Sequence, residues 1–289
     1  MGNAPLPQSR RCTPGRVLAT IPKELDSGGC PQGEVKGRIK KSCSLWFILG
    51  TLLFSAPLPA YAMHISEGIL PLPWAALWFA VAALFVVTGV RQLNRLARQD
   101  LAMKPLVGLL AAVVFIISCM PIPVPTAGTC SHPCGTGIAA ILVGPLVSVV
   151  ISTVALLIQA LVMAHGGLST LGADIVSMGV VGSFAGYFAF RLLRFAGAGL
   201  GASAFAAGVV TDWATYMTTS FELASGIRGS EPFWPLATNI MLAFVPTQLL
   251  LGVLEGAMTA GMVTLLARKR PDLLIKMKLL TPGEATGRA

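Results

Sequence analysis

The sequence of 289 residues contains little charge: Asp, Glu, Lys and Arg make up 11% of it, whereas 54% is hydrophobic. Soluble domains carry roughly 25% charged residues, and the mean hydropathy here is +0.75. Too few charged side chains are present to cover the surface of a water-soluble enzyme. The sequence therefore predicts an all-α polytopic membrane protein.

Acidic residues are especially scarce, which leaves a net charge of +9. Residues 1–62 contain eight basic and three acidic residues and so account for +5 of this charge. The remaining basic residues gather in short connections between apolar stretches, as in membrane proteins whose cytoplasmic loops are positive. We therefore expect no nucleic-acid partner, and we interpret the charge as a record of membrane orientation.

The first 62 residues have the parts of a secretory signal peptide. A basic patch over Lys36–Lys41 precedes an apolar run from Leu45 to Phe54, and Ala60-Tyr-Ala62 supplies small residues before a cleavage site. The alternative is a first transmembrane helix, but the run is shorter than the ~20 residues needed to cross a bilayer. Pro57 and Pro59 also interrupt it. We expect cleavage after Ala62.

This leader divides the chain into three predicted parts. Residues 1–62 are the leader, 63–267 form a membrane domain, and 268–289 form a cytoplasmic tail. The polar segment 1–34 is unusual before a signal peptide, and translation that starts near Val35 would explain it. Cleavage would leave Met63 as the N-terminus of the mature protein, on the extracytoplasmic side. We expect the protein to be located in the inner membrane of the cell.

Basic residues set the number of membrane crossings. The apolar stretches are 74–90, 105–121, 137–164, 172–190, 199–221 and 236–267, which gives six. An outside N-terminus and basic, inside connections (91–104, 191–194 and 268–278) require an odd number. A short segment at 135–143, followed by a helix that starts at Pro145, repairs the count. We predict about seven helices, a cytoplasmic C-terminus, and a loop from Thr126 to Gly137 that enters the bundle.

Histidine occurs only three times, at positions 64, 132 and 165, each near the outer end of a predicted span. The free amine of Met63, the backbone amide of His64 and its imidazole can close adjacent chelate rings in one plane. His132 is the natural fourth donor. Four nitrogen atoms in a square suit late divalent metals such as Ni²⁺, Cu²⁺ and Co²⁺, not Mg²⁺ or Ca²⁺.

Two cysteines, Cys130 and Cys134, flank His132. They can form a disulfide, remain small buried thiols, or bind the metal through sulfur. Their spacing is not that of a structural zinc site, and thiolates would hold a soft metal too tightly for rapid release. We predict nitrogen ligation at the capture site, with the cysteines supporting the loop.

Several polar residues are candidates for contacts around the ligands. His165 either fixes a ligand imidazole or simply ends a helix. Asp174 either caps a helix or orients His165, and Glu67 can add negative charge. Ser131, next to His132, is a further candidate.

Carboxylates are costly inside a membrane, so Asp212, Glu222 and Glu255 stand out. Glu255 lies in the middle of a predicted helix, where it either hydrogen-bonds within the bundle or gates it. Gly182 and Gly186 form a GxxxG pair, which favours close helix contact.

Five blocks together resemble one family: Met63-His-Ile-Ser-Glu-Gly-Ile-Leu-Pro71, Cys130-Ser-His-Pro133, Ala164-His-Gly-Gly-Leu-Ser-Thr-Leu-Gly-Ala173, Ser177-Met-Gly-Val-Val-Gly182 and Asp212-Trp-Ala-Thr-Tyr216. They are similar to CbiM, the substrate-binding (S) component of cobalt energy-coupling factor (ECF) transporters, which is related to the nickel component NikM. The resemblance covers essentially all of 63–267. It departs at Cys134, where threonine is usual in the cobalt branch, and at Asp174, where asparagine is common.

The resemblance implies a seven-helix fold and a metal held by Met63, His64 and His132. It further implies Co²⁺ import that feeds cobalamin biosynthesis. The implied partners are a CbiQ-like coupling subunit, a pair of CbiO-like ATPases and a small CbiN-like subunit. The chain has no GxxxxGK[ST] loop of its own, so the ATPase would have to be separate.

Two alternatives remain at this stage. One is a nickel-specific subunit of the same type, since both ions accept a square of nitrogens. The other is an intramembrane metalloenzyme, which the absence of HExxH and GxSxG motifs disfavours. We expect a transporter subunit without enzymatic activity and without a cofactor other than the ion it carries.

Overall fold

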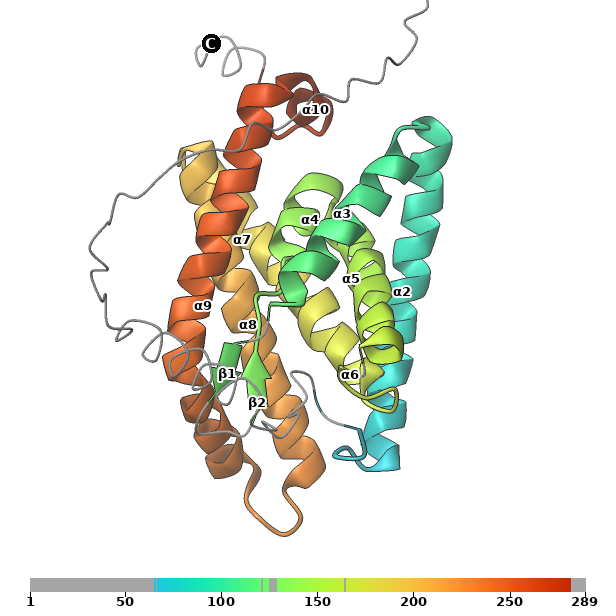
Figure 1. The fold of residues 1–289 in the computed structure, drawn as a ribbon, viewed down its shortest axis with the longest axis vertical. Coiled ribbons are helices and arrows are strands. Elements are labelled where there is room, and N and C mark those ends of the chain that lie inside the picture. The colour runs from blue at the N-terminus through green and yellow to red at the C-terminus, as the bar shows by residue number, and fades with distance from the viewer. Residues whose placement is uncertain (1–64, 66, 121, 125–128, 164, 282–289) are drawn as a thin grey trace, which may run out of the picture. The chain divides into compact units, whose positions relative to one another are not determined.

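The computed structural model describes residues 65, 67–120, 122–124, 129–163 and 165–281. The predicted leader and the predicted ligands Met63 and His64 lie outside these residues. The described part is mainly helical (Figure 1). Its helices are α2 (Leu72–Gln99), α3 (Met103–Ser118), α4 (Thr136–Val143), α5 (Pro145–Val162), α6 (Leu171–Asp174), the π-helix η1 (Ile175–Gly182), α7 (Ser183–Phe195), α8 (Leu200–Ile227), α9 (Phe233–Lys269) and α10 (Pro271–Lys276).

Membrane character is confirmed by the helices themselves. Among the described residues, four helices are long and apolar enough to cross a bilayer: α2, α5, the continuous helix Leu171–Phe195 formed by α6, η1 and α7, and α9. The apolar helix α3 is shorter, with 16 residues. The seven crossings and their direction stay predictions.

The predicted break before Pro145 is confirmed. Helix α4 ends at Gly144, whose φ of 89° favours glycine, and α5 starts with Pro145 in its first turn. All eight residues of α4 are buried, as expected for a helix that is apolar on every face. The loop residues just before α4, 131–135, are buried too, so the end of this loop enters the bundle as predicted.

A small β-ribbon departs from the all-α prediction. Strands β1 (Ile122–Val124) and β2 (Thr129–Ser131) pair antiparallel, with Ile122 opposite Ser131 and Val124 opposite Thr129. Backbone pairing satisfies N–H and C=O groups that a loop entering an apolar bundle would otherwise leave without partners. The ribbon places His132 directly after a strand (Figure 1).

Helix α8 packs closely against two other elements because glycines face it. A Cβ on Gly186 or Gly182 would collide with the hydroxyl oxygens of Thr211 or Thr215 on α8. The predicted close contact of the GxxxG pair is therefore confirmed. Gly208 of α8 lies equally close to the α9 backbone at Glu255, so α8 is wedged between α7 and α9.

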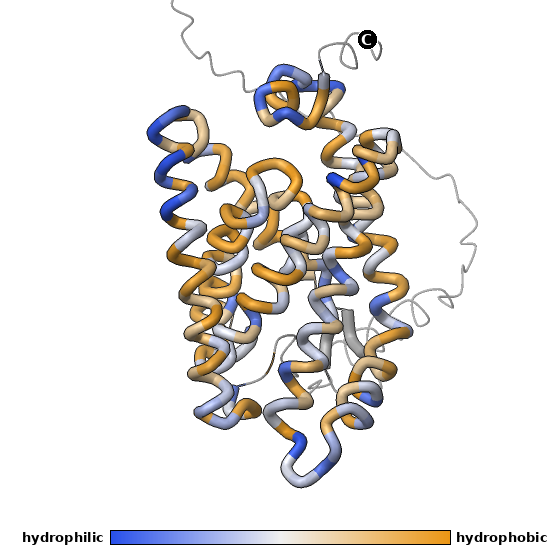
Figure 2. Tube along the Cα trace, turned by 180° about the vertical axis from the view of Figure 1, so that it is seen from behind, coloured by the Kyte–Doolittle hydropathy of each residue, from blue (hydrophilic) through white to orange (hydrophobic). Residues whose placement is uncertain are grey.

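The basic connections gather at one end of the bundle. Figure 1 shows the α2–α3 turn, the α7–α8 connection and α10 at the same end, and Figure 2 shows hydrophilic colour at the α2–α3 turn and around α10. Lys276 of α10 forms an ion pair with Asp100 of the α2–α3 turn. Arg191 and Arg194 line a groove with Lys278. This arrangement agrees with loops that share one side of a membrane.

Candidate metal centre

His132 is held in place by its backbone. Its N–H donates to the hydroxyl oxygen of Tyr216 on α8 at 3.0 Å, and that hydroxyl donates back to the His132 carbonyl at 3.2 Å. The side chain is 2% exposed. One tyrosine thus fixes both backbone polar groups of the residue that carries the imidazole.

The ring of His132 is oriented so that one nitrogen can bind a metal. Nδ1 lies 3.0 Å from the carbonyl oxygen of Pro133. A carbonyl can only accept, so Nδ1 carries the hydrogen and Nε2 of the neutral ring keeps its lone pair. This is the tautomer that metal-ligating histidines usually adopt when a carbonyl holds their other nitrogen.

His165 lies beside His132, with ring centroids 6.4 Å apart and the planes at 64°. Burial lowers the pKa of His165, which favours its neutral, metal-binding form. The structure therefore brings two of the three histidines together, as the sequence predicted. His165 thus lies where its ring is next to that of His132, and its role in fixing a ligand imidazole stays a prediction.

The segment that follows His64 is tied to the loop before α6. The hydroxyl of Thr170 donates to the carbonyl of Ile65 at 2.6 Å, and the Ile65 N–H points to the Asp174 carboxylate at 3.4 Å. Glu67 accepts the N–H of Ser169 at 3.1 Å. These contacts join chain segments about one hundred residues apart at the end of the bundle opposite the basic connections (Figure 1).

The structure shows what the two acidic candidates contact, and their roles at the site stay predictions. Asp174 ends α6 and is the N-cap residue of η1, without a side-chain capping hydrogen bond; it is buried and accepts a hydrogen bond from Ile65. Glu67 is exposed, and hydrogen bonds from Ser169 lower the pKa of its carboxyl group. Glu67 therefore fastens the N-terminal segment to the loop.

Ser131 fastens the loop to α9. The side-chain amide Nε2 of Gln248 donates to the Ser131 hydroxyl at 2.5 Å. The indole N–H of Trp213 on α8 donates to the backbone carbonyl of Gln248 at 3.0 Å. Through this hydrogen bond to α9, Ser131 holds the end of strand β2, directly before His132, in place.

Of the two cysteines that flank His132, the structure describes the side chain of Cys134. Cys134 is a free, fully buried thiol, which agrees with the buried-thiol alternative and not with a disulfide. The side chain of Cys130 lies outside what the structure describes. Glu255 accepts hydrogen bonds from the backbone N–H groups of Cys134 at 2.6 Å and Gly135 at 3.0 Å, which confirms the prediction that it bonds within the bundle.

Tyr216 is the site residue that sequence reasoning missed as such. It stands in the Asp212-Trp-Ala-Thr-Tyr216 block, and the spacing of four places Asp212 and Tyr216 on one helix face. That periodicity was the available signal, but it did not say which loop the face would meet. A small cavity of about 20 Å³ lies there, lined by His132, Cys134, Asp174, Ser177, Met178, Thr215, Tyr216 and Thr219.

The fold and these contacts define a polytopic membrane protein with a buried histidine site at one end. The family described as "Cobalt uptake substrate-specific transmembrane region" (CbiM) matches residues 64–273. The chain belongs to this family.

Named relatives agree. A "Cobalt transport protein CbiM" from Geobacter sulfurreducens is 74% identical over 236 residues, which cover 82% of this chain and 68% of that protein. Another from Sorangium cellulosum is 57% identical over 76% of this chain and 99% of its own length. These relatives are named as transport proteins.

Solved structures share the fold. A structure described as a truncated transition metal transporter superposes with a TM-score of 0.63 at 25% identity and covers 71% of this chain and 98% of its own. A second, described as a transition metal transporter, gives a TM-score of 0.65 at 23% identity, over 76% of this chain and all of its own. This likeness, together with the family, supports metal uptake as the coarse function.

Proposed function

We propose that this chain is the substrate-capture subunit of an ECF transporter that imports Co²⁺. The amine of Met63, the amide and imidazole nitrogens of His64 and Nε2 of His132 bind the ion at the extracytoplasmic end. A separate ATPase pair and a coupling subunit then drive the ion inward. Cobalt is proposed over nickel because the relatives are named for cobalt, and the imported metal would serve cobalamin biosynthesis.

The single observation that carries this proposal is the geometry of His132. Its backbone is fixed by Tyr216, and its Nδ1 faces the Pro133 carbonyl, so that Nε2 is the nitrogen that carries the lone pair in the neutral ring. Support comes from Ile65, which directly follows His64 in the chain and is bonded to Thr170 and Asp174. Asp174 lines the same cavity as His132.

The basic end of the bundle is the surface that the proposed coupling and ATPase subunits would contact. The α2–α3 turn, the α7–α8 connection and α10 lie at the end of the bundle opposite the proposed capture site (Figure 1). We propose that this end faces the cytoplasm of the cell, where the CbiQ-like and CbiO-like subunits would contact it. A CbiN-like subunit would join the complex as a separate chain.

The test changes the position of the N-terminal amine. One alanine inserted between Ala62 and Met63 moves the amine away from His64 and so breaks the adjacent chelate rings. Co²⁺ affinity of the purified mature protein, measured by isothermal titration, is expected to fall at least 100-fold.

The control for this insertion is Met63→Ala. It changes the first side chain but retains the free amine, the amide and His64, so its high-affinity binding should match the wild type. N-terminal sequencing of each variant verifies the cleavage site. Retained high-affinity binding in a protein that starts Ala-Met-His would refute the N-terminal chelate.

A further inference from the structure

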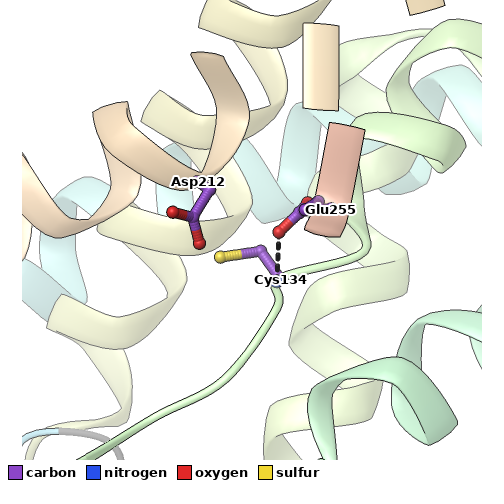
Figure 3. Close-up of side chains that lie close together, drawn as sticks. All are labelled: Cys134, Asp212 and Glu255. Atoms are coloured by element: carbon purple, nitrogen blue, oxygen red, sulfur yellow. Dashed lines mark hydrogen bonds between the residues drawn. The ribbon is translucent and has the colours of Figure 1, made fainter. Parts of the chain in front are cut away.

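Three buried side chains that can bind a metal meet next to the His132 site. Cys134 comes from the loop before α4, Asp212 from α8 and Glu255 from α9, and they are at most 1% exposed. One ligand atom from each lies within 4.8 Å of the others. Figure 3 shows the Asp212 carboxylate and the Cys134 sulfur turned toward each other, with Glu255 on the other side of Cys134.

The Asp212 carboxylate is buried without a described hydrogen-bond partner, which suggests that it binds a ligand. Both its oxygens are buried and have no hydrogen-bond partner in the part of the chain that the structure describes. The contrast with Glu255, which accepts two backbone N–H groups, shows that the fold satisfies one carboxylate and leaves the other open. Of the ion pairs between described residues, neither involves Asp212 or Glu255.

A bound cation would stabilise this cluster. Ionised carboxylates that are buried without a counter-charge are expensive, and a divalent ion between Asp212, Glu255 and the Cys134 sulfur would compensate them. One sulfur and two carboxylate donors fit Co²⁺ or Zn²⁺ better than Mg²⁺, which prefers oxygen ligands alone. Coordination by sulfur releases the thiol proton to solvent.

One small cavity lies next to a residue of each proposed site. Cys134 and His132 both line this cavity of about 20 Å³, which is enough for one water-sized species. Tyr216, which holds His132, is one helical turn from Asp212 on α8. The cavity thus adjoins one donor of each site.

We propose that Cys134, Asp212 and Glu255 form a second, internal binding site for a divalent transition-metal ion. The role of this site as a stop on the way inward rests on the proposed function. Its ability to bind the ion does not.

The test measures directly whether the Cys134 sulfur binds the metal. Co²⁺ is added to the purified mature protein that starts at Met63, bound ions are counted after removal of free metal, and the thiolate-to-cobalt charge-transfer absorption is recorded. The wild type is expected to bind two ions and to show the absorption. Cys134→Ser should bind one ion and lose the absorption, whereas Cys119→Ser, a change at another described free cysteine, should keep both.

A second variant guards against loss of folding in Cys134→Ser. Asp212→Asn retains size and removes charge, and since its oxygens have no described partner, the thermal unfolding temperature without metal should hold or rise. Affinity for the second ion should fall at least 10-fold. A wild type that binds without the sulfur absorption, or an absorption that follows Cys130 instead of Cys134, would overturn the site.

The variant with alanine inserted before Met63 separates this proposal from the capture proposal. It should lose the nitrogen-bound ion and keep the sulfur absorption. If it loses neither, the capture site is wrong and the internal site stands. If the wild type and this variant both lack the absorption, the internal site is wrong, whatever the nitrogen ligands do.

Discussion

At the scale of single residues, Tyr216 is the group on which the position of His132 depends. Its hydroxyl serves as acceptor and donor to the same peptide unit, and its ring packs on Phe244 of α9, with centroids 5.5 Å apart. A loop histidine without such support would sample several positions. We therefore expect the tyrosine to contribute to metal affinity at the proposed site without touching the metal.

Tyr216→Phe tests this contribution. The ring remains, but the two backbone groups of His132 lose their partner, so Co²⁺ affinity should fall by about 10-fold, in the range typical for residues that orient ligands. Tyr187→Phe is the matched control because Tyr187 packs on Phe188 of α7, away from the site. Titration calorimetry on both proteins measures the difference, and equal affinities would remove Tyr216 from the site.

Among the histidines, His132→Ala should cost more affinity than His165→Ala. In the proposed capture site His132 is the ligand, whereas the His165 ring lies beside it with centroids 6.4 Å apart. The expected order is loss of the high-affinity phase for His132→Ala and a drop of about 10-fold for His165→Ala. Competition with a metal-binding dye reports both, and the reverse order would assign the ligand to His165.

At the scale of secondary structure, small residues decide how close the helices come. The Thr211 hydroxyl of α8 sits where a Cβ of Gly186 would be, and the face of α8 that carries Asp212 and Tyr216 is positioned by this contact. A larger residue on α7 would push α8 outward. The site geometry thus depends on a glycine that has no chemistry of its own.

Gly186→Val should lower stability by roughly 1–3 kcal/mol, as is typical for overpacking. The thermal unfolding temperature in detergent is the measurement, and metal affinity should fall with it because α8 carries Tyr216. Gly261→Val is the control, since a Cβ at Gly261 meets no described atom within 4 Å. A Gly186→Val protein as stable as the control would show that the helices separate freely.

At the scale of the whole molecule, charge and site lie at opposite ends. The α2–α3 turn, the α7–α8 connection and α10 share one end, and the tethered N-terminal segment lies at the other (Figure 1). In a membrane, the basic end should face the cytoplasm. Single cysteines at Leu168 and Ala196, both at exposed positions, should then label from opposite sides in oriented vesicles, in a background without native cysteines. Labelling from the same side would contradict the predicted orientation.

The sequence by itself determined the membrane class, the helix break and the candidate histidines. Low charge excludes a water-exposed surface, Gly144-Pro145 favours the end of one helix and the start of another, and three histidines in an apolar chain leave few donors to choose from. These are local or compositional properties, so they can be read without knowing which segments meet. The β-ribbon was not predicted because its pairing depends on the enclosing bundle.

Only the tertiary structure decided what surrounds those donors. Nothing in the spacing of Ser169 and Glu67, or of Cys134, Asp212 and Glu255, indicates that they meet, because these residues are 43 to 121 positions apart in the chain. Likewise the sequence left Asp174 as a possible cap, and packing made it an acceptor for Ile65. Which buried polar groups have hydrogen-bond partners, and which do not, follows from how helices pack around a loop.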